Sequence, residues 1–142
     1  MQLKIKPLVP YAIPPKYQTD GAACFDLHAC VGIIIPGGKA ATVSTGIAVE
    51  IPDGYVMLVY SRSGHAFRSN VRLGNCVGVI DSDYRGEVMV RLMNDSQDLF
   101  VIEPGDRIAQ AMVIPVPKVE LIEVQDLTDT ERGTGGFGST GK

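Results

Sequence analysis

Acidic and basic side chains recur in this chain beside glycines, in short segments that could bind and hydrolyse phosphate esters. Asp81 and Asp83 flank a serine within Gly78–Gly86, and a carboxylate there can take the proton of an attacking water. Arg62 and Arg132 stand beside glycine and hydroxyl residues. An arginine can form paired, charge-assisted bonds to phosphate oxygens that lysine does not reproduce. Phosphoanhydride hydrolysis needs these parts: a positioned water, a base, and positive charge around the phosphates.

Two common motifs are excluded at the same segments. Asp81–Gly86 begins like an EF-hand loop, but Arg85 and Leu92 stand where that loop requires oxygen ligands. Gly136–Lys142 resembles part of a P-loop, but the motif is incomplete and no helix is expected to follow. Taken singly, Arg62 and its neighbours are typical of a solvated turn, and the glycine-rich tail is typical of a linker.

The cysteines predict neither a disulfide framework nor a structural zinc site. Cys24, Cys30 and Cys76 are odd in number and show no CxxC spacing. His28 lies between the first two, but no fourth ligand is evident. We therefore expect these side chains to be structural.

Composition limits the classes of partner. The 142 residues fit one domain, and the net charge of −3 with dispersed Lys and Arg argues against a stable nucleic-acid-binding face. No apolar run approaches the roughly 20 residues of a membrane helix, and Met1–Pro10 lacks a signal-peptide core. We expect a cytoplasmic protein without membrane contact.

The pattern of apolar residues predicts an all-β fold. Leu3 and Ile5 alternate with lysines, and Val88, Val90 and Leu92 share a face opposite Arg91. Turn sequences at Pro36-Gly37-Gly38, Pro52-Asp53-Gly54 and Pro104-Gly105-Asp106 separate short apolar runs, which is typical of a sandwich or barrel. The resulting predictions are a hairpin of Gly46–Ile51 with Tyr55–Tyr60, another of Leu99–Glu103 with Arg107–Ile114, and a strand over Val119–Val124 after Pro115 and Pro117.

Five segments in order, spanning residues 22–140, resemble the motifs of the trimeric dUTPase family. They are Ala22–Leu27, Ser61–Gly64, Gly78–Gly86, Gly105–Gln110 and Arg132–Thr140. One such segment alone is weak support for the resemblance, whereas five in order with family-like spacing are specific to this family. The chain departs from the family's usual residues at Cys24, at Ser61 and in the stretch His65–Leu73.

The resemblance implies a fold and an assembly. We expect a jelly-roll-like, distorted β-barrel over residues 1–130, including an arm that is exchanged between chains of a homotrimer. Residues 131–142 form a flexible, glycine-rich lid. Each site is then shared: one chain supplies the first, second and fourth motifs, another the third, and the last chain the tail.

The resemblance also implies an activity in nucleotide metabolism. The family splits dUTP into dUMP and pyrophosphate by water attack at the α-phosphorus, with Mg²⁺ as cofactor. This keeps uracil out of DNA and supplies dUMP for dTMP synthesis. Asp81 becomes the catalytic base, and Asp26 and Gln110 contact the ion through water. The expected substrate-binding residues are Arg62, Ser63, Gly64, Asn75, Gly78, Val79, Ile80, Tyr84, Met89, Gln110, Arg132, Phe137, Gly138, Ser139 and Thr140.

Specificity is expected from Asn75–Tyr84, which the family folds as a hairpin. Its backbone groups match the edge of uracil, and a site built for one hydrogen-bond pattern rejects another. Tyr84 excludes a ribose 2′-OH, and Phe137 stacks on the base as part of the lid. Each residue also has a structural interpretation: Tyr84 as a strand-end core residue, and Asp26 as a buried side chain that fixes a turn.

Two other functions stay open. A dCTP deaminase shares this fold, but needs a general acid-base Glu and usually has Arg-Ser-Ser where this chain has Arg62-Ser63-Gly64. A non-catalytic, nucleotide-sensing interaction protein could use the same scaffold.

Overall fold

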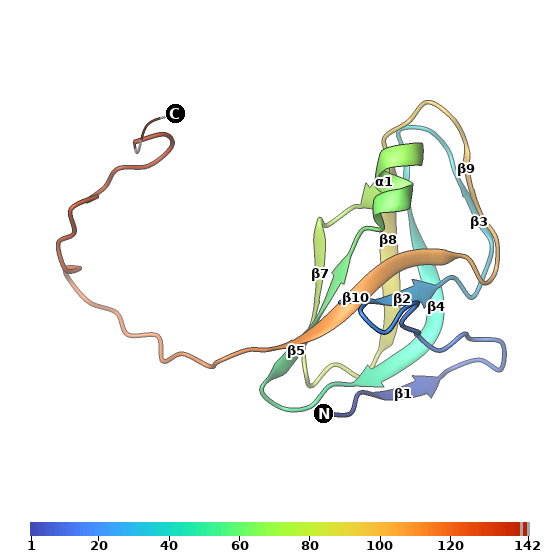
Figure 1. The fold of residues 1–142 in the computed structure, drawn as a ribbon, viewed down its shortest axis with the longest axis horizontal. Coiled ribbons are helices and arrows are strands. Elements are labelled where there is room, and N and C mark those ends of the chain that lie inside the picture. Colours follow the sequence, from blue (N-terminus) through green and yellow to red (C-terminus); the bar gives the residue numbers. More distant parts are fainter. Residues whose placement is uncertain (140, 142) are drawn as a thin grey trace.

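The computed structural model describes residues 1–139 and 141 of the chain. Within them the chain forms ten strands and one short helix (Figure 1). The elements are β1 (Lys4–Pro7), β2 (Phe25–His28), β3 (Ile33–Ile35), β4 (Ala40–Glu50), β5 (Tyr55–Tyr60), α1 (Ser63–Ser69), β6 (Val71–Leu73), β7 (Val77–Ile80), β8 (Glu87–Asn94), β9 (Phe100–Ile102) and β10 (Arg107–Pro115). The predicted all-β class is confirmed.

The strands form two four-stranded sheets and one small sheet. The first sheet has the order β1-β4-β8-β6, the second β2-β10-β5-β7, and β3 pairs with β9. All the pairings between these strands are antiparallel. This arrangement is jelly-roll-like, with two separate sheets rather than a closed barrel among the described residues.

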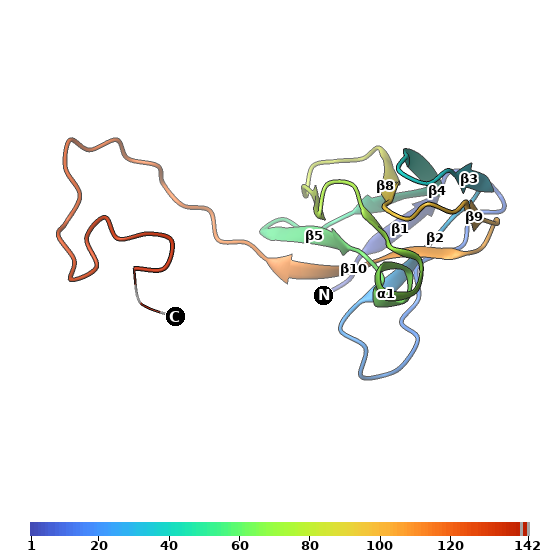
Figure 2. The ribbon, with the colours of Figure 1, turned by 90° about the horizontal axis from the view of Figure 1, so that it is seen from above.

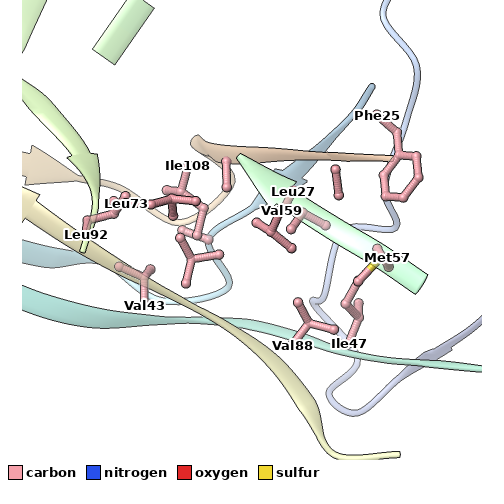
Figure 3. Packing of buried hydrophobic residues seen from close by; sticks show 14 of the residues in the cluster. Phe25, Leu27, Val43, Ile47, Met57, Val59, Leu73, Val88, Leu92 and Ile108 are labelled. Carbon is pink, nitrogen blue, oxygen red and sulfur yellow. The ribbon is translucent and has the colours of Figure 1, made fainter. Parts of the chain in front are cut away.

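The hydrophobic core lies between the two larger sheets (Figure 3). On β8, Val88, Val90 and Leu92 are buried while Met89 and Arg91 are exposed, so the predicted alternation is confirmed. Met57 and Val59 of β5 meet them from the second sheet. Full burial of side chains of this size contributes about 1.5–3 kcal/mol each, so the core holds the two sheets together.

Both predicted hairpins are wrong in their pairing, although their strands exist. β4 pairs with β1 and β8, whereas β5 pairs with β7 and β10. β9 pairs with β3, whereas β10 pairs with β2 and β5. The turns at Pro52–Gly54 and Pro104–Asp106 therefore carry the chain from one sheet to another. Turn residues fix a reversal of direction, but burial of the strands decides which neighbour each one bonds.

Two further local predictions need correction. The segment after Arg62 forms the helix α1 rather than a turn alone, and the helix ends at Asn70 in the left-handed conformation (φ 51°). Val119–Val124, predicted as a strand, is not part of one within this single chain. β10 ends at Pro115, one residue beyond the predicted strand, and the N–H of Val116 still donates to the backbone oxygen of Gly54 at 2.8 Å.

The segment that follows β10 runs away from the sheets and curves back in the solvent (Figures 1 and 2). Nearly all of its described residues are exposed. No helix in the part of the chain that the structure describes has the length and apolar character needed to cross a membrane.

Candidate active site

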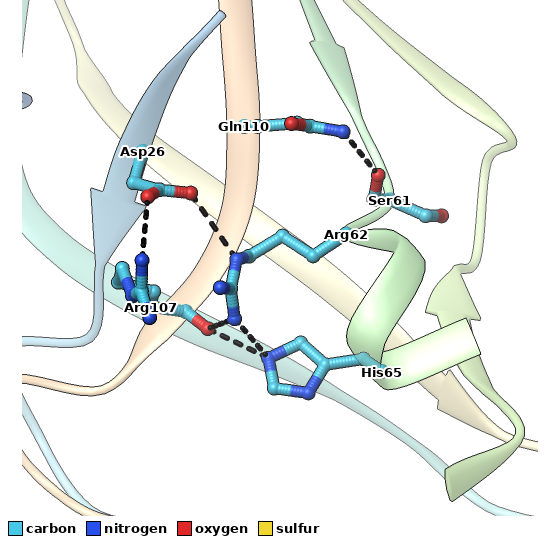
Figure 4. A network of polar contacts seen from close by, with 6 residues as sticks. All are labelled: Asp26, Ser61, Arg62, His65, Arg107 and Gln110. Atoms are coloured by element: carbon cyan, nitrogen blue, oxygen red, sulfur yellow. Dashed lines mark hydrogen bonds and ion pairs between the residues drawn. The ribbon is translucent and has the colours of Figure 1, made fainter. Parts of the chain in front are cut away.

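Asp26 is the centre of a network of charged side chains from three separate segments (Figure 4). On β2 it lies between Phe25 and Leu27, which face the core, so alternation turns its carboxylate to the opposite face of the sheet. Its Oδ1 accepts a hydrogen bond from Nε of Arg62 at 3.1 Å, and its Oδ2 accepts one from Nη1 of Arg107 at 3.3 Å. The side chain of Asp26 is only 10% exposed. The carboxylate is therefore largely screened from water, whereas the side chain of Arg107 is 44% exposed.

Arg62 reaches this network from the start of α1. It occupies the position before the first helical residue and makes no capping bond with its side chain, which extends toward Asp26. Its Nη1 also donates to the backbone oxygen of Arg107 at 3.0 Å. Two arginines face one carboxylate, which leaves one positive charge in excess. Such a partly buried, fixed guanidinium is suited to bind a phosphate oxygen.

Gln110 and Ser61 connect the segments around Asp26, Arg62 and Arg107, and these five residues form what we call the cationic corner. Nε2 of Gln110 donates to the backbone oxygen of Ser61 at 3.0 Å, and the hydroxyl of Ser61 accepts from the backbone N–H of Leu73 at 2.8 Å. The departure at Ser61 thus links the end of β5 to β6. Ser63 and Gly64 open α1 beside this corner and are exposed.

Burial and charge shift two titratable groups at this corner. Burial lowers the pKa of His28, with Arg107 and Arg62 acting in the same direction and Asp26 opposing them. Burial also raises the pKa of the Cys24 thiol, and the charge of Asp26 raises it further. A lowered histidine pKa and a raised thiol pKa favour the neutral forms, so Arg62 and Arg107 supply the cationic charge.

A hollow of about 240 Å³ lies beside β7, at the opposite edge of the second sheet from β2, which carries Asp26. It is lined by Val79, Ile80, Asp81, Tyr84, Glu87 and Met89. Pockets that enclose a whole small ligand are about 300–1,000 Å³. This hollow can hold part of a nucleotide, and another element must cover the remainder.

The turn that carries Asp81 and Tyr84 is braced by its own bonds. The N–H of Tyr84 donates to the backbone oxygen of Asp81 at 3.2 Å, and the hydroxyl of Tyr84 donates to the backbone oxygen of Glu87 at 3.0 Å. A Cβ at Gly86 would collide with the Tyr84 ring in its present position, so glycine here lets the ring lie against the turn. The tyrosine is 41% exposed, and its ring lines the hollow rather than the core.

The segment Asn75–Tyr84 differs from the predicted hairpin. β7 pairs with β5, and the next strand, β8, pairs with β4 and β6, so the strands on either side of the Asp81–Gly86 turn belong to different sheets. The open space between them is the hollow. Gly78 packs against β5, where an added Cβ would lie 3.1 Å from Cβ of Val59. The exposed Asn75 precedes β7.

The tail residues lie apart from both regions. Arg132 donates from Nε to the backbone oxygen of Gly135 at 2.8 Å, and the ring of Phe137 is fully exposed. Gly138 has a φ of +87°, and Ser139 is exposed. Thr140, also expected in the site, lies outside the described residues.

One chain therefore brings the expected site residues into separate groups. Asp26, Arg62 and Gln110 are together, whereas Asp81 follows β7 at the other edge of the same sheet. Strands lie about 4.8 Å apart, so the two edges of four strands are separated by about 14 Å. No single α-phosphate can contact both groups within one chain.

Arg107 and His65 are parts of the Asp26 network that the sequence did not predict as site residues. Arg107 lies within the fourth resembling segment, which was a usable signal, but its bond to Asp26 spans 81 positions. His65 lies in the divergent stretch, and no local pattern indicates its contact with Arg107.

The described residues contain no group of three or more His, Cys, Asp or Glu side chains that could hold a metal ion. Both oxygens of Asp26 already accept bonds from arginines. An ion that keeps several waters and binds mainly to phosphate oxygens, as Mg²⁺ does, is compatible with this donor set. An ion that must be coordinated by protein side chains alone is not compatible with this donor set.

The cationic corner and a hollow that can hold part of a nucleotide are features of a protein that binds phosphorylated ligands, and comparison with known proteins is consistent with this class. The sequence profile of the dUTPase family matches residues 10–141. The deoxyuridine 5'-triphosphate nucleotidohydrolase of Nautilia profundicola is 51% identical over 142 residues and aligns over the whole of both chains. That of Helicobacter pylori is 45% identical over 141 residues, covering 99% of this chain and 97% of its own. The dUTPase of Staphylococcus bacteriophage 80alpha, solved with dUPNHPP, is 28% identical with a TM-score of 0.92 and covers 99% of each chain.

This chain belongs to the dUTPase family. The resemblance drawn from five ordered segments is confirmed by matches that span nearly the whole chain.

Proposed function

We propose that this chain is a dUTP diphosphatase that hydrolyses dUTP to dUMP and pyrophosphate with Mg²⁺ as cofactor. The observation that carries the proposal is the pairing of Arg62 with Asp26 at 3.1 Å, which fixes a cationic group in the second family motif. The exposed carboxylate of Asp81 beside the hollow supplies the base that water attack requires.

The site is shared between the chains of a homotrimer. Arg62 and Asp81 belong to groups at opposite edges of one sheet, so one chain does not present both to a single triphosphate. The hollow at Tyr84 is too small to enclose the ligand alone, and the tail of the same chain extends away from it. A neighbouring chain's Asp26 corner and a third chain's tail complete the site.

Asp81 takes the proton of the water that attacks the α-phosphorus, and pyrophosphate leaves. General-base assistance of this kind contributes about 10²- to 10⁴-fold in rate. Arg62 and Arg132 bind the phosphate oxygens and stabilise the charge that develops on the leaving group. Ser63, Gly64 and Ser139 add hydroxyl and backbone N–H donors, and the glycine permits a close approach of the backbone.

Mg²⁺ bound to the phosphates would neutralise part of their charge. Asp26 and Gln110 would contact its water shell, with Asp26 also holding Arg62 and Arg107 in place. The side chain of Gln110 donates its amide to Ser61, so its oxygen is the atom that remains to accept from a water.

Uracil binds beside β7, where the backbone of Gly78, Val79 and Ile80 and the amide of Asn75 match its edge. A site with this hydrogen-bond pattern rejects cytosine because polar groups would be left unpaired. Tyr84 packs against the sugar and excludes a 2′-OH, with Met89 beside it in the hollow. From another chain, Phe137 and Gly138 close over the base and exclude water. Such an enzyme keeps uracil out of DNA, supplies dUMP for dTMP synthesis, and acts in the cytoplasm.

The proposal is tested by incubating the protein with Mg²⁺ and either dUTP or dCTP while pyrophosphate and ammonia are both measured. We expect pyrophosphate from dUTP and neither product in quantity from dCTP. Ammonia from dCTP would indicate a deaminase, and no product from either nucleotide would indicate a binding protein. Both of these results contradict the proposal.

A further inference from the structure

His65 lies beside the guanidinium of Arg62, on the helix that follows it (Figure 4). Its Nε2 is 2.6 Å from the backbone oxygen of Arg107. Its ring meets the ring of Phe100 edge to face, with centroids 5.3 Å apart and planes at 81°. The imidazole is therefore fixed between an aromatic ring on β9 and a carbonyl on β10.

The partners of His65 determine which of its nitrogens carries the proton. A carbonyl oxygen only accepts hydrogen bonds, so Nε2 of His65 must donate to Arg107. Nη1 of Arg62 donates to the same oxygen at 3.0 Å and lies 3.2 Å from Nε2 of His65. Two donors cannot bond to each other, so the imidazole and the guanidinium converge on one acceptor.

This convergence limits the orientations of Arg62. Its Nε is bound to Asp26 and its Nη1 to the Arg107 carbonyl. Among the residues that the structure describes, Nη2 has no hydrogen-bond partner. The imidazole occupies the space beside Nη1, and a guanidinium held in this way presents Nη2 to a ligand.

We propose that His65 is a positioning residue that holds Arg62 in the orientation in which it binds the substrate phosphates. The inference rests on the proposed function and adds to it a residue from the stretch where this chain departs from the family's usual sequence. A contact fixed before substrate arrives reduces the ordering that binding must otherwise impose, so removal of His65 weakens phosphate binding through Arg62.

A matched pair of substitutions separates the donor from the packing. In His65→Gln the amide nitrogen is the same number of bonds from Cβ as Nε2 and can donate to the Arg107 carbonyl. His65→Met has the same length but no donor, and His65→Leu is a second apolar variant should His65→Met unfold. Phe67→Leu is the control on the same helix, because Phe67 is 88% exposed.

The first readout is the binding of dUPNHPP by calorimetry, alongside kcat and KM for dUTP, on variants whose thermal unfolding matches the wild type. We expect His65→Met to weaken dUPNHPP binding and to lower kcat/KM by about tenfold, the loss typical of one hydrogen bond near a charged group. His65→Gln and Phe67→Leu should stay within about threefold of wild type. Equal losses in His65→Gln and His65→Met would overturn the donor's role.

The second readout repeats the His65→Met comparison in an Arg62→Ala background. A residue that acts through Arg62 has no further effect once Arg62 is removed, whereas a merely structural residue weakens binding by the same factor in both backgrounds. Equal factors would overturn the proposal while the wild type remains active on dUTP. A wild type that neither binds dUPNHPP nor hydrolyses dUTP would overturn the proposed function together with it.

Discussion

Arg62 and Asp81 follow opposite ends of two paired strands. Asp81 comes after Ile80, which pairs with Met57 near the start of β5, and Arg62 comes just after the end of β5. At about 3.3 Å per residue, their backbones are roughly 15–20 Å apart. The side chain of Arg62 then turns toward β2, away from β7. This separation supports the proposal that the base and the phosphate-binding arginine of one site come from two chains.

The role of Asp81 predicts the effect of Asp81→Asn. This change keeps the size of the side chain but removes the base, so kcat should fall at least about a hundredfold. Binding of dUPNHPP should be nearly unchanged, because asparagine still fits beside the hollow. Steady-state kinetics and calorimetry on the same preparation check both parts. Turnover close to that of the wild type would show that the base is another group.

The position of Tyr84 predicts its effect on sugar selection. Tyr84→Ala removes the ring from the hollow, so the ratio of kcat/KM for dUTP over UTP should fall. Tyr84→Phe is the matched control, since it loses only the bond from the hydroxyl to the Glu87 backbone and should keep most of the ratio. An unchanged ratio in Tyr84→Ala would make Tyr84 a packing residue.

The exposure of the tail leads to the prediction that its removal abolishes activity but leaves folding and assembly intact. A chain that ends at Thr130 should fold and assemble like the full chain, because the described residues beyond it are almost all exposed and contribute no core. It should lose nearly all turnover, since Arg132, Phe137 and Ser139 are removed together. Light scattering and pyrophosphate release test the two statements. Full activity in the truncated chain would make the tail a linker.

His28 predicts a pH dependence of stability. Burial lowers its pKa, with Arg107 and Arg62 adding to the effect and Asp26 opposing it, and its Nδ1 is buried with no partner among the described residues. The unfolded chain therefore binds a proton first as the pH falls below the ordinary value of 6.5, and the free energy of unfolding decreases until the folded histidine also titrates.

Urea unfolding at pH 8 and pH 5.5 measures this loss. In His28→Gln the loss on acidification should be smaller, because one proton-binding difference between the folded and unfolded states is gone. An identical loss in the variant and the wild type would assign the pH dependence to other groups.

The sequence predicts the strands and the site segments better than it predicts their pairing. The alternation along β8 and the proline at the end of β10 depend on each strand's own residues, so they can be inferred locally. The pairing of β4 and β5 depends on which sheet buries each of them, and adjacent turn residues carry no information on that. The contacts of Asp26 with Arg62 and Arg107 join positions 36 and 81 residues apart. Resemblance to a family was enough to identify the site segments, whereas the contacts of His65 and Ser61 could be identified only from the structure.

A shared site makes the assembly itself testable. Light scattering of the full chain should give three times the chain mass, and a monomer would contradict the proposed trimer. The exchanged arm is expected to order Val119–Val124 against a neighbouring chain, since the apolar side chains of that segment are exposed and it forms no strand alone.

The most direct measurement mixes two inactive variants. The Arg62→Ala and Asp81→Asn variants are each expected to be nearly inactive as pure trimers. The two variants are mixed at equal concentrations, unfolded, and refolded together. Random assembly gives each site an independent chance of an intact Arg62 from one chain and an intact Asp81 from another, so about a quarter of wild-type turnover should return. If both residues served a site within one chain, every site would keep one defect and no activity would return. Recovery near a quarter is the result that a shared dUTPase site predicts, and its absence in correctly assembled mixed trimers would contradict it.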